Sequence, residues 1–284
     1  MDTNIITEVL ILGAAQDAGL PQLGCRCNNC QSVRSGTLDA DTAASIALID
    51  HSINKFWIVD ATPDIRDQLE YLERQCPGYE MAGVILTHAH MGHYAGLMFL
   101  GRESINTTKI PVFCTDTMAE FLKNNAPWQQ LVSLENIQLN IISSGHPFVL
   151  SEQITCSAQL VPHRAEYSDT LAISVFGQNK SLFFCPDIDR WETWHANIRD
   201  VVSLHDVSLV DATFFDANEL PGRDMSKIPH PLVIDTLERL SGVTTEAVLI
   251  HINHTNPIYQ DETIIAQVLS AGLNVAKRGM RWAL

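Results

Sequence analysis

The sequence contains no apolar segment long enough to cross a lipid bilayer. Its longest uninterrupted apolar runs, such as residues 9–12 and 84–86, have the length of a strand, whereas a membrane-spanning helix needs about 20 apolar residues. No basic segment precedes the first apolar stretch, and the opening residues instead include Asp2 and Glu8. Because a secretory signal begins with a basic segment, we expect none here and predict a cytoplasmic protein without a membrane partner.

Basic residues are scarce. The chain has 18 lysines and arginines against 33 aspartates and glutamates, a formal net charge of -15. No cluster of basic residues offsets this charge, so the protein would repel the phosphate backbone of extended RNA or DNA. We therefore expect a small-molecule substrate, which can still be an anion if a bound metal holds it. The sequence is also compatible with a homodimer.

The chain also lacks internal repeats and low-complexity linkers, so a single domain over residues 1–284 is the simplest organisation. Strand-like and helix-like segments alternate along it. Strands are predicted at residues 8–13, 43–50, 55–61, 81–86, 110–116, 137–143, 153–163, 170–177, 181–187, 207–215 and 247–253. Helices are predicted at residues 64–75, 117–125, 232–240 and 261–271. This order permits two sheets flanked by helices.

A disulfide framework is not expected, because the seven cysteines are odd in number and no secretory signal precedes them. Four stand singly among apolar neighbours, as buried cysteines do: Cys76, Cys114, Cys156 and Cys185. The other three, Cys25, Cys27 and Cys30, form a CxCxxC cluster. Three thiolates on a tight loop need one more ligand to close a tetrahedral zinc site. Reactive thiols or unliganded surface cysteines are the alternatives.

Three histidines lie within six residues in the segment THAHMGHYAGL, residues 87–97. His88 and His90 are two residues apart, so at the end of an extended strand both point to the same side and can share a metal. His93 follows after a turn. An isolated histidine more often caps a helix or satisfies a buried polar group, but this spacing favours a metal site. Imidazoles suit zinc, iron, nickel and manganese without strong discrimination among them.

Further candidate site residues follow later apolar segments. They are His163, Asp187, Asp211 and His251. Any one of them alone is equally well explained as a helix cap or a turn residue, whereas the ordered set predicts one site at the edge of a sheet. Asp60, which ends another predicted strand, either orients a metal-binding imidazole by a hydrogen bond or caps that strand.

The motif His88-x-His90-x-Gly92-His93, followed by His163, Asp187 and His251, resembles the metallo-β-lactamase superfamily, whose usual motif is HxHxDH. The resemblance implies an α/β (α+β) fold, a four-layer αββα sandwich with a dinuclear metal site between its sheets. It further implies the roles of the ligands. The first metal would be held by His88, His90 and His163, the second by His93 and His251, and Asp187 would bridge them.

Gly92 departs from this pattern, because it stands where the family has an aspartate. A missing carboxylate removes one anionic ligand from the second metal, so we expect that site to bind weakly or to stay empty. Glycine would also leave room for water or a substrate atom. The centre is therefore expected to hold one or two divalent metals, as Zn²⁺, Mn²⁺ or Fe²⁺.

The cysteine cluster has its own counterpart in the superfamily. In the PhnP phosphodiesterases, a CxCxxC motif and a histidine three residues after the last active-site histidine hold a structural zinc. Cys25, Cys27, Cys30 and His254 match that pattern. The resemblance thus implies a Cys₃His zinc site that stabilises the fold.

Segments along nearly the whole chain resemble the PqqB branch, which serves pyrroloquinoline quinone biosynthesis; examples are ILGAAQDAGLPQLGCRCNNC and HINHTNP. That resemblance implies a metal-dependent oxidative enzyme. The histidine set instead favours a hydrolase acting on a small ester, phosphodiester or lactone, with Asp187 and His230 as catalytic residues. His230 and Arg223 would contact an anionic group or transfer a proton, although ordinary loop roles explain them equally well. A non-catalytic metal-binding or carrier protein is the third alternative.

Overall fold

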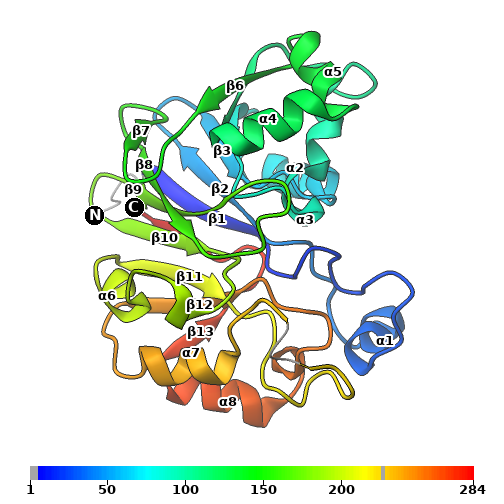
Figure 1. Ribbon diagram of the computed structural model, residues 1–284, viewed down its shortest axis with the longest axis vertical. Helices are drawn as coiled ribbons and strands as arrows, with labels where there is room; N and C mark the ends of the chain where they lie inside the picture. Colours follow the sequence, from blue (N-terminus) through cyan, green and yellow to red (C-terminus); the bar gives the residue numbers. More distant parts are fainter. Residues whose placement is uncertain (1–5, 225–227) are drawn as a thin grey trace.

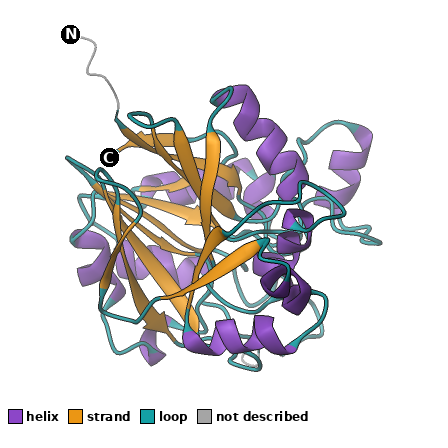
Figure 2. Ribbon diagram, turned by 90° about the horizontal axis from the view of Figure 1, so that it is seen from above, coloured by secondary structure: helices purple, strands orange, loops and turns teal. Residues whose placement is uncertain are grey.

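Two seven-stranded β-sheets face each other, and helices cover the outer side of each. The computed structural model describes residues 6–224 and 228–284. Seen from above, the strands form two central layers with helices on either side (Figure 2). The predicted αββα sandwich is therefore confirmed.

The first sheet is built mainly from the first half of the chain. Its strand order is β14-β1-β2-β3-β4-β5-β6. The bounds are β1 (Thr7–Gly13), β2 (Ser45–Asp50), β3 (Lys55–Val59), β4 (Glu80–Ile85), β5 (Ile110–Cys114), β6 (Ile137–Ile141) and β14 (Arg281–Ala283). Strands β3 to β6 run parallel, while β14, β1, β2 and β3 pair antiparallel. The C-terminal strand β14 thus completes the sheet that the N-terminal half begins.

The second sheet is built from the second half. Its order is β13-β12-β11-β10-β9-β8-β7. The bounds are β7 (Pro147–Val149), β8 (Thr155–Val161), β9 (Thr170–Phe176), β10 (Ser181–Cys185), β11 (Val207–Asp211), β12 (Glu246–Ile250) and β13 (Leu273–Val275). Strands β10 to β13 are parallel, and β7 to β10 are antiparallel.

Helices pack on the outer face of each sheet (Figure 1). The first sheet carries α2 (Ile65–Gln75), α3 (Met91–Tyr94), α4 (Asp116–Asn124) and α5 (Trp128–Ser133). The second carries α6 (Ile198–Ser203), α7 (Val233–Leu240) and α8 (Glu262–Ser270). The short helix α1 (Asn28–Ser35) lies apart from both layers. Among the described residues, no helix has the length and apolar character needed to span a membrane.

The main core lies between the two sheets. Leu48 of β2 and Phe184 of β10 are both completely buried in the same apolar cluster, which joins side chains from both sheets. Strands β1 and β2 are buried on both faces, because helices cover the side that turns away from this core. This double burial explains why these strands appear in the sequence as continuous apolar runs.

Candidate metal centre

The histidine motif occupies the turn that follows β4. His88 and His90 lie between the strand and α3, and His93 lies within that helix. His88 and His93 are each 1% exposed, whereas His90 is partly exposed. His163, after β8 of the other sheet, brings its Nε2 atom to 3.2 Å from Nδ1 of His90. The sandwich thus brings the predicted first-metal residues together from both sheets.

This trio has the arrangement expected of a ligand set. His88, His90 and His163 each offer one ring nitrogen, and these atoms lie within 4.8 Å of one another. Nε2 of His88 is buried and makes no hydrogen bond to any described residue, although buried polar atoms are almost always paired. A divalent cation would satisfy it, so these residues fit a metal. Imidazole ligands suit zinc, manganese and iron(II).

Asp187, which follows β10, lies between two groups of histidines. Its Oδ1 atom is 3.6 Å from Nε2 of His163, while Oδ2 is 3.0 Å from Nε2 of His93 and 3.3 Å from Nε2 of His251. Burial opposes the charge of this carboxylate, but His251 and His93 hold the pKa of Asp187 well below its usual value. Asp187 therefore lies where its predicted bridging role requires it.

The second group contains a residue that the sequence did not single out. Oδ1 of Asp17, in the loop after β1, lies 3.1 Å from Nε2 of His93 and 3.3 Å from Nε2 of His251. Burial opposes its ionisation, but hydrogen bonds from His251 and His93 hold the pKa of Asp17 well below its usual value. The one signal in the sequence was that Asp17 is the only acidic residue between Glu8 and Asp39 and lies shortly after the predicted strand 8–13.

Asp17 corrects the expectation for Gly92. A Cβ atom at Gly92 would lie 2.2 Å from Oδ1 of Asp17 and 2.7 Å from its Cα. The space beside Gly92 is therefore filled and is not open to water or substrate. The expectation that the second group loses the carboxylate that the family has at position 92 was wrong, because Asp17 from another segment lies beside Gly92 and next to His93 and His251.

Buried carboxylates and hydroxyls orient the imidazoles. Oδ2 of Asp60 is 2.7 Å from Nδ1 of His93 and accepts a bond from the Thr87 hydroxyl at 2.8 Å. That hydroxyl also lies 2.9 Å from Nδ1 of His88. Asp60 and His251 both adopt left-handed backbone conformations, with φ of 68° and 61°. Such strain in non-glycine residues costs about 1–3 kcal/mol and concentrates at functional sites.

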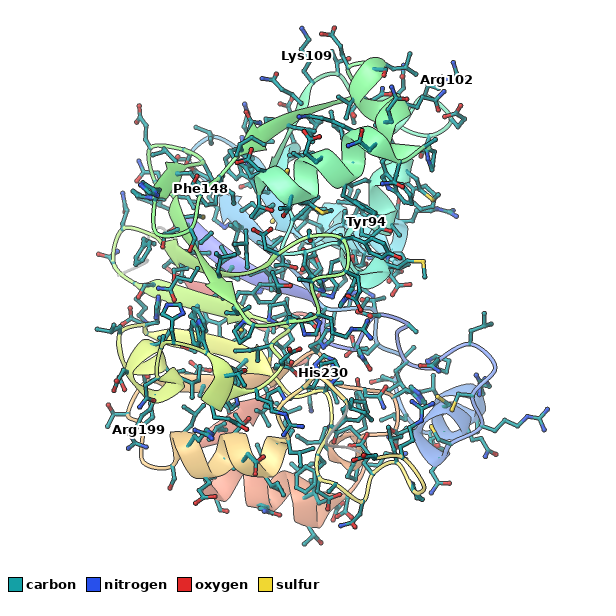
Figure 3. All side chains as sticks on the ribbon, viewed as in Figure 1. Tyr94, Arg102, Lys109, Phe148, Arg199 and His230 are labelled. Atoms are coloured by element: carbon teal, nitrogen blue, oxygen red, sulfur yellow. The ribbon has the colours of Figure 1, made fainter. Side chains whose placement is uncertain are left out.

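Asp211, at the end of β11, organises the other side of the centre. Its Oδ2 atom is 2.8 Å from Nδ1 of His230, and its Oδ1 accepts the Thr213 hydroxyl at 2.7 Å. The same hydroxyl lies 2.9 Å from Nδ1 of His251. Burial lowers the pKa of His230, but Asp211 outweighs it and the net pKa is raised. In the view of Figure 3, His230 lies near the middle of the molecule.

A cavity of about 580 Å³ opens onto these residues. Its lining includes His90, His163, Asp187 and His230 together with two arginines, Arg164 and Arg223. Arg164 also pairs with Glu166, at 3.2 Å between Nε and Oε1. The volume falls in the range of pockets that bind small molecules, about 300–1,000 Å³. Both arginines thus line the same cavity as the histidines, and Glu166 offsets part of the charge of Arg164.

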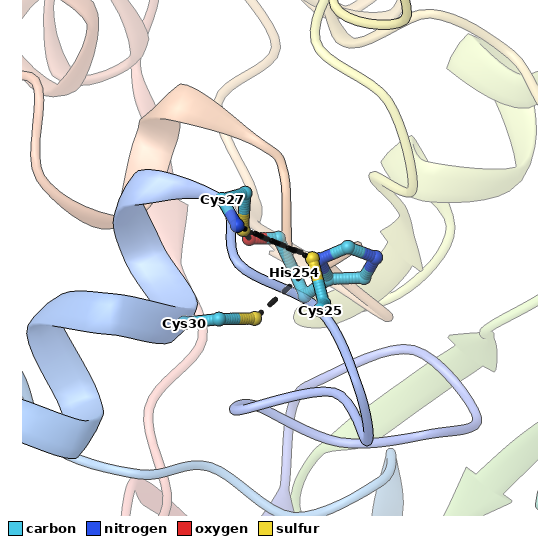
Figure 4. A group of neighbouring side chains, drawn as sticks. All are labelled: Cys25, Cys27, Cys30 and His254. Atoms are coloured by element: carbon cyan, nitrogen blue, oxygen red, sulfur yellow. Dashed lines mark hydrogen bonds between the residues drawn. The ribbon is translucent and has the colours of Figure 1, made fainter.

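The cysteine cluster also meets its predicted partner (Figure 4). Sγ of Cys27 is 3.4 Å and Sγ of Cys30 is 3.6 Å from Nδ1 of His254, and Cys25 completes a group whose ligand atoms lie within 4.8 Å. Tetrahedral zinc with its usual bond lengths separates sulfur and nitrogen ligands by about 3.6 Å. Burial raises the pKa of Cys30 to about 12, which favours the protonated thiol. A zinc ion bound at the cluster would counter this effect and favour the thiolate. These four residues fit zinc.

Known proteins share this architecture. The family described as the Beta-lactamase superfamily domain matches residues 57–252. Coenzyme PQQ synthesis protein B of Azotobacter vinelandii is 30% identical over 306 residues, covering 96% of this chain and 98% of the relative. The corresponding protein of Pseudomonas fluorescens is also 30% identical, with the same coverage.

Solved structures agree on the fold. Zinc-bound PqqB from Methylobacterium extorquens has a TM-score of 0.85 at 21% identity, covering 98% of this chain and all of that one. A diphosphatase of the PhnP family has a TM-score of 0.72 at 17% identity, covering 97% and 96%. The chain belongs to the metallo-β-lactamase superfamily. Within it, the sequence is PqqB-like, similar over nearly its whole length to coenzyme PQQ synthesis protein B.

Proposed function

We propose that this protein is a metal-dependent hydrolase that cleaves a small ester, phosphodiester or lactone. The observation that carries the proposal is the cluster of His88, His90 and His163 with Asp187 beside it, at a cavity that His90, His163 and Asp187 line. When bound there, a divalent cation polarises a substrate oxygen and lowers the pKa of water toward 7. Among the three substrate classes, Arg164 and Arg223 favour the anionic phosphodiester.

The protein's own residues would supply proton transfer. Asp211 engages Nδ1 of His230 at 2.8 Å, which leaves Nε2 as the nitrogen that holds or releases a proton. Asp211 raises the pKa of His230, which favours the protonated form more than in a free histidine, so this imidazole can donate a proton to the leaving oxygen. His230 therefore acts as general acid, and Asp211 is its positioning residue.

The test is a panel of carboxylic esters, phosphodiesters and lactones, assayed with the zinc-loaded and the manganese-loaded protein. We expect hydrolysis of one class and a loss of about 100-fold or more in His90→Ala, because this change removes a metal ligand. His146→Ala is the matched control, since His146 is exposed and its ring lies beside the Ser144 carbonyl, in none of the groups of described residues that could hold a metal. Activity that survives His90→Ala would contradict the assigned site.

A second candidate function is favoured by the relatives. Their name, coenzyme PQQ synthesis protein B, links those relatives to the formation of that cofactor. The candidate function drawn from this resemblance is a metal-dependent oxidative step in the same synthesis. Iron(II)-loaded protein would then consume oxygen, with no hydrolysis by the zinc or manganese forms. A protein that binds metal but shows neither activity would be the non-catalytic carrier.

A further inference from the structure

Asp17 is held next to the second group of histidines by its backbone. Ala15 bridges to Ile252, and the Gln16 amide donates to the Ile252 carbonyl at 2.8 Å. Ile252 directly follows His251, so this pairing fixes the loop after β1 against the end of β12. The carboxylate of Asp17 therefore meets His251 through local backbone contacts and not through a long flexible side chain.

The oxygen and nitrogen atoms of this group have the spacing of ligands around one metal. Oδ1 of Asp17 lies 3.1 Å from Nε2 of His93 and 3.3 Å from Nε2 of His251. Oδ2 of Asp187 lies 3.0 and 3.3 Å from the same two nitrogens. Ligands at about 2.0–2.1 Å from a tetrahedral cation lie about 3.3 Å apart. Asp60 and Thr213 bind the opposite ring nitrogens, so both Nε2 atoms face this point.

We propose that Asp17 completes a second divalent-metal site with His93, His251 and the shared Asp187, in place of the aspartate that Gly92 replaces. This inference rests on the proposed metal-dependent function of the same centre. It makes the centre dinuclear, with a ligand that comes from the N-terminal loop and not from the histidine motif.

Gly92 is then a steric requirement. Any side chain at position 92 would place a Cβ atom 2.2 Å from Oδ1 and 2.5 Å from Cγ of Asp17. Real Cβ atoms do not approach other atoms so closely, so the Asp17 carboxylate would have to leave the histidines. Asp17 and Gly92 therefore depend on each other. The carboxylate comes from the loop after β1, whereas the family's aspartate comes from the histidine motif, and glycine at 92 leaves the room that Asp17 needs.

Metal counting tests the proposal. Zinc-saturated, gel-filtered wild-type protein is expected to hold three zinc ions per chain by elemental analysis, one of them at the cysteine cluster. Asp17→Asn should hold two. A zinc indicator titration should show the weakest site loosened by about 100-fold or more, because outer hydrogen-bond partners alone are worth about 10–100-fold. Gly92→Ala should weaken the same site without removing a ligand.

Asp39→Asn is the control, because Asp39 is exposed and belongs to none of the metal-ligating groups; it should hold three zinc ions. Circular dichroism and the retained cysteine-site zinc verify that each variant is folded. Two zinc ions in the wild type, or undiminished affinity in Asp17→Asn, would overturn the proposal. If zinc counts follow the expectation but no ester is cleaved, the hydrolase function fails and the assignment of Asp17 stands.

Discussion

Individual residues at the centre serve two neighbours at once. Asp211 binds His230 directly and reaches His251 through the Thr213 hydroxyl, and it also accepts the Ile188 amide at 3.1 Å. Because Ile188 follows Asp187, this one carboxylate fixes the proposed general acid, one proposed metal ligand and the segment that carries the proposed bridging ligand. A buried network of this kind is stable only when each polar atom is satisfied, which holds the side chains in one arrangement.

His230→Gln should separate proton transfer from metal binding. We expect kcat to fall by about 10²–10⁴-fold, the usual contribution of a general acid, with the zinc content unchanged because His230 lies outside the two proposed ligand sets. Steady-state kinetics and elemental analysis check this. His195→Gln, at an exposed histidine, serves as the control. A normal kcat in His230→Gln would remove His230 from the catalytic residues.

At the scale of elements, the cysteine site joins two distant segments of the chain. Asn29 of α1 donates to the carbonyls of His254 and Asn256, at 3.0 and 2.8 Å, and accepts from Gln260 at 2.6 Å. Helix α1 has only eight residues and no side-chain cap at its N-terminus. Such a short helix is marginal by itself, so these contacts hold it in place, and a zinc ion at the four predicted ligands would add to them.

Cys27→Ser should therefore release one zinc ion per chain and lower the melting temperature, by an amount on the order of 5 °C for a loss of a few kcal/mol. Cys76→Ser is the matched control, since Cys76 is buried away from the cluster and lies in the core of the first sheet. That variant should keep its full zinc content, whatever its stability. Equal zinc content and stability in Cys27→Ser and the wild type would refute the zinc assignment.

At the scale of the whole molecule, acidic residues outnumber basic ones, and one of them, Asp41, lies where its carboxylate is poorly solvated. The net charge is -15 at neutral pH. Burial raises the pKa of Asp41 from its ordinary 3.8 to about 7, and Asp64 adds to the effect, although the Ala14 amide and Arg278 oppose it. Asp41 lies in the segment that pairs with Leu20 near β1. Ionising it in the folded protein costs more than in the unfolded chain.

The sign of the resulting pH dependence follows. Between about pH 4 and 7 the folded protein retains a proton on Asp41 that the unfolded chain has lost, so stability falls as the pH rises through this window. Asp41→Asn removes the effect, so its stability relative to the wild type should rise by on the order of 4 kcal/mol between pH 4 and pH 8, because a shift of about three pKa units is worth about 1.4 kcal/mol per unit. Urea unfolding at both values measures it. If the free energies of unfolding of Asp41→Asn and the wild type differed by the same amount at pH 4 and at pH 8, Asp41 would not be the source of the pH dependence.

Local sequence patterns predicted most of the fold. The continuous apolar runs of β1 and β2 and the amphipathic helices α2 and α7 were identified near their observed bounds. Strands β7, β13 and β14 were not, because each has only three residues and forms through pairing with a distant strand. A three-residue segment carries too little periodicity to be recognised.

The chemistry of the site divides in the same way. The histidines, Asp187 and the cysteines stand in short motifs, so the sequence by itself determined which residue types gather and what class of ion they suit. Only the tertiary structure decided that Asp17 lies beside Gly92, 75 positions away, and that the apparent gap in the motif is filled. The physical reason is that the spacing of residues in a motif reflects only local backbone geometry. Which side chain fills the space beside Gly92 depends on how the two sheets and the loop after β1 pack together.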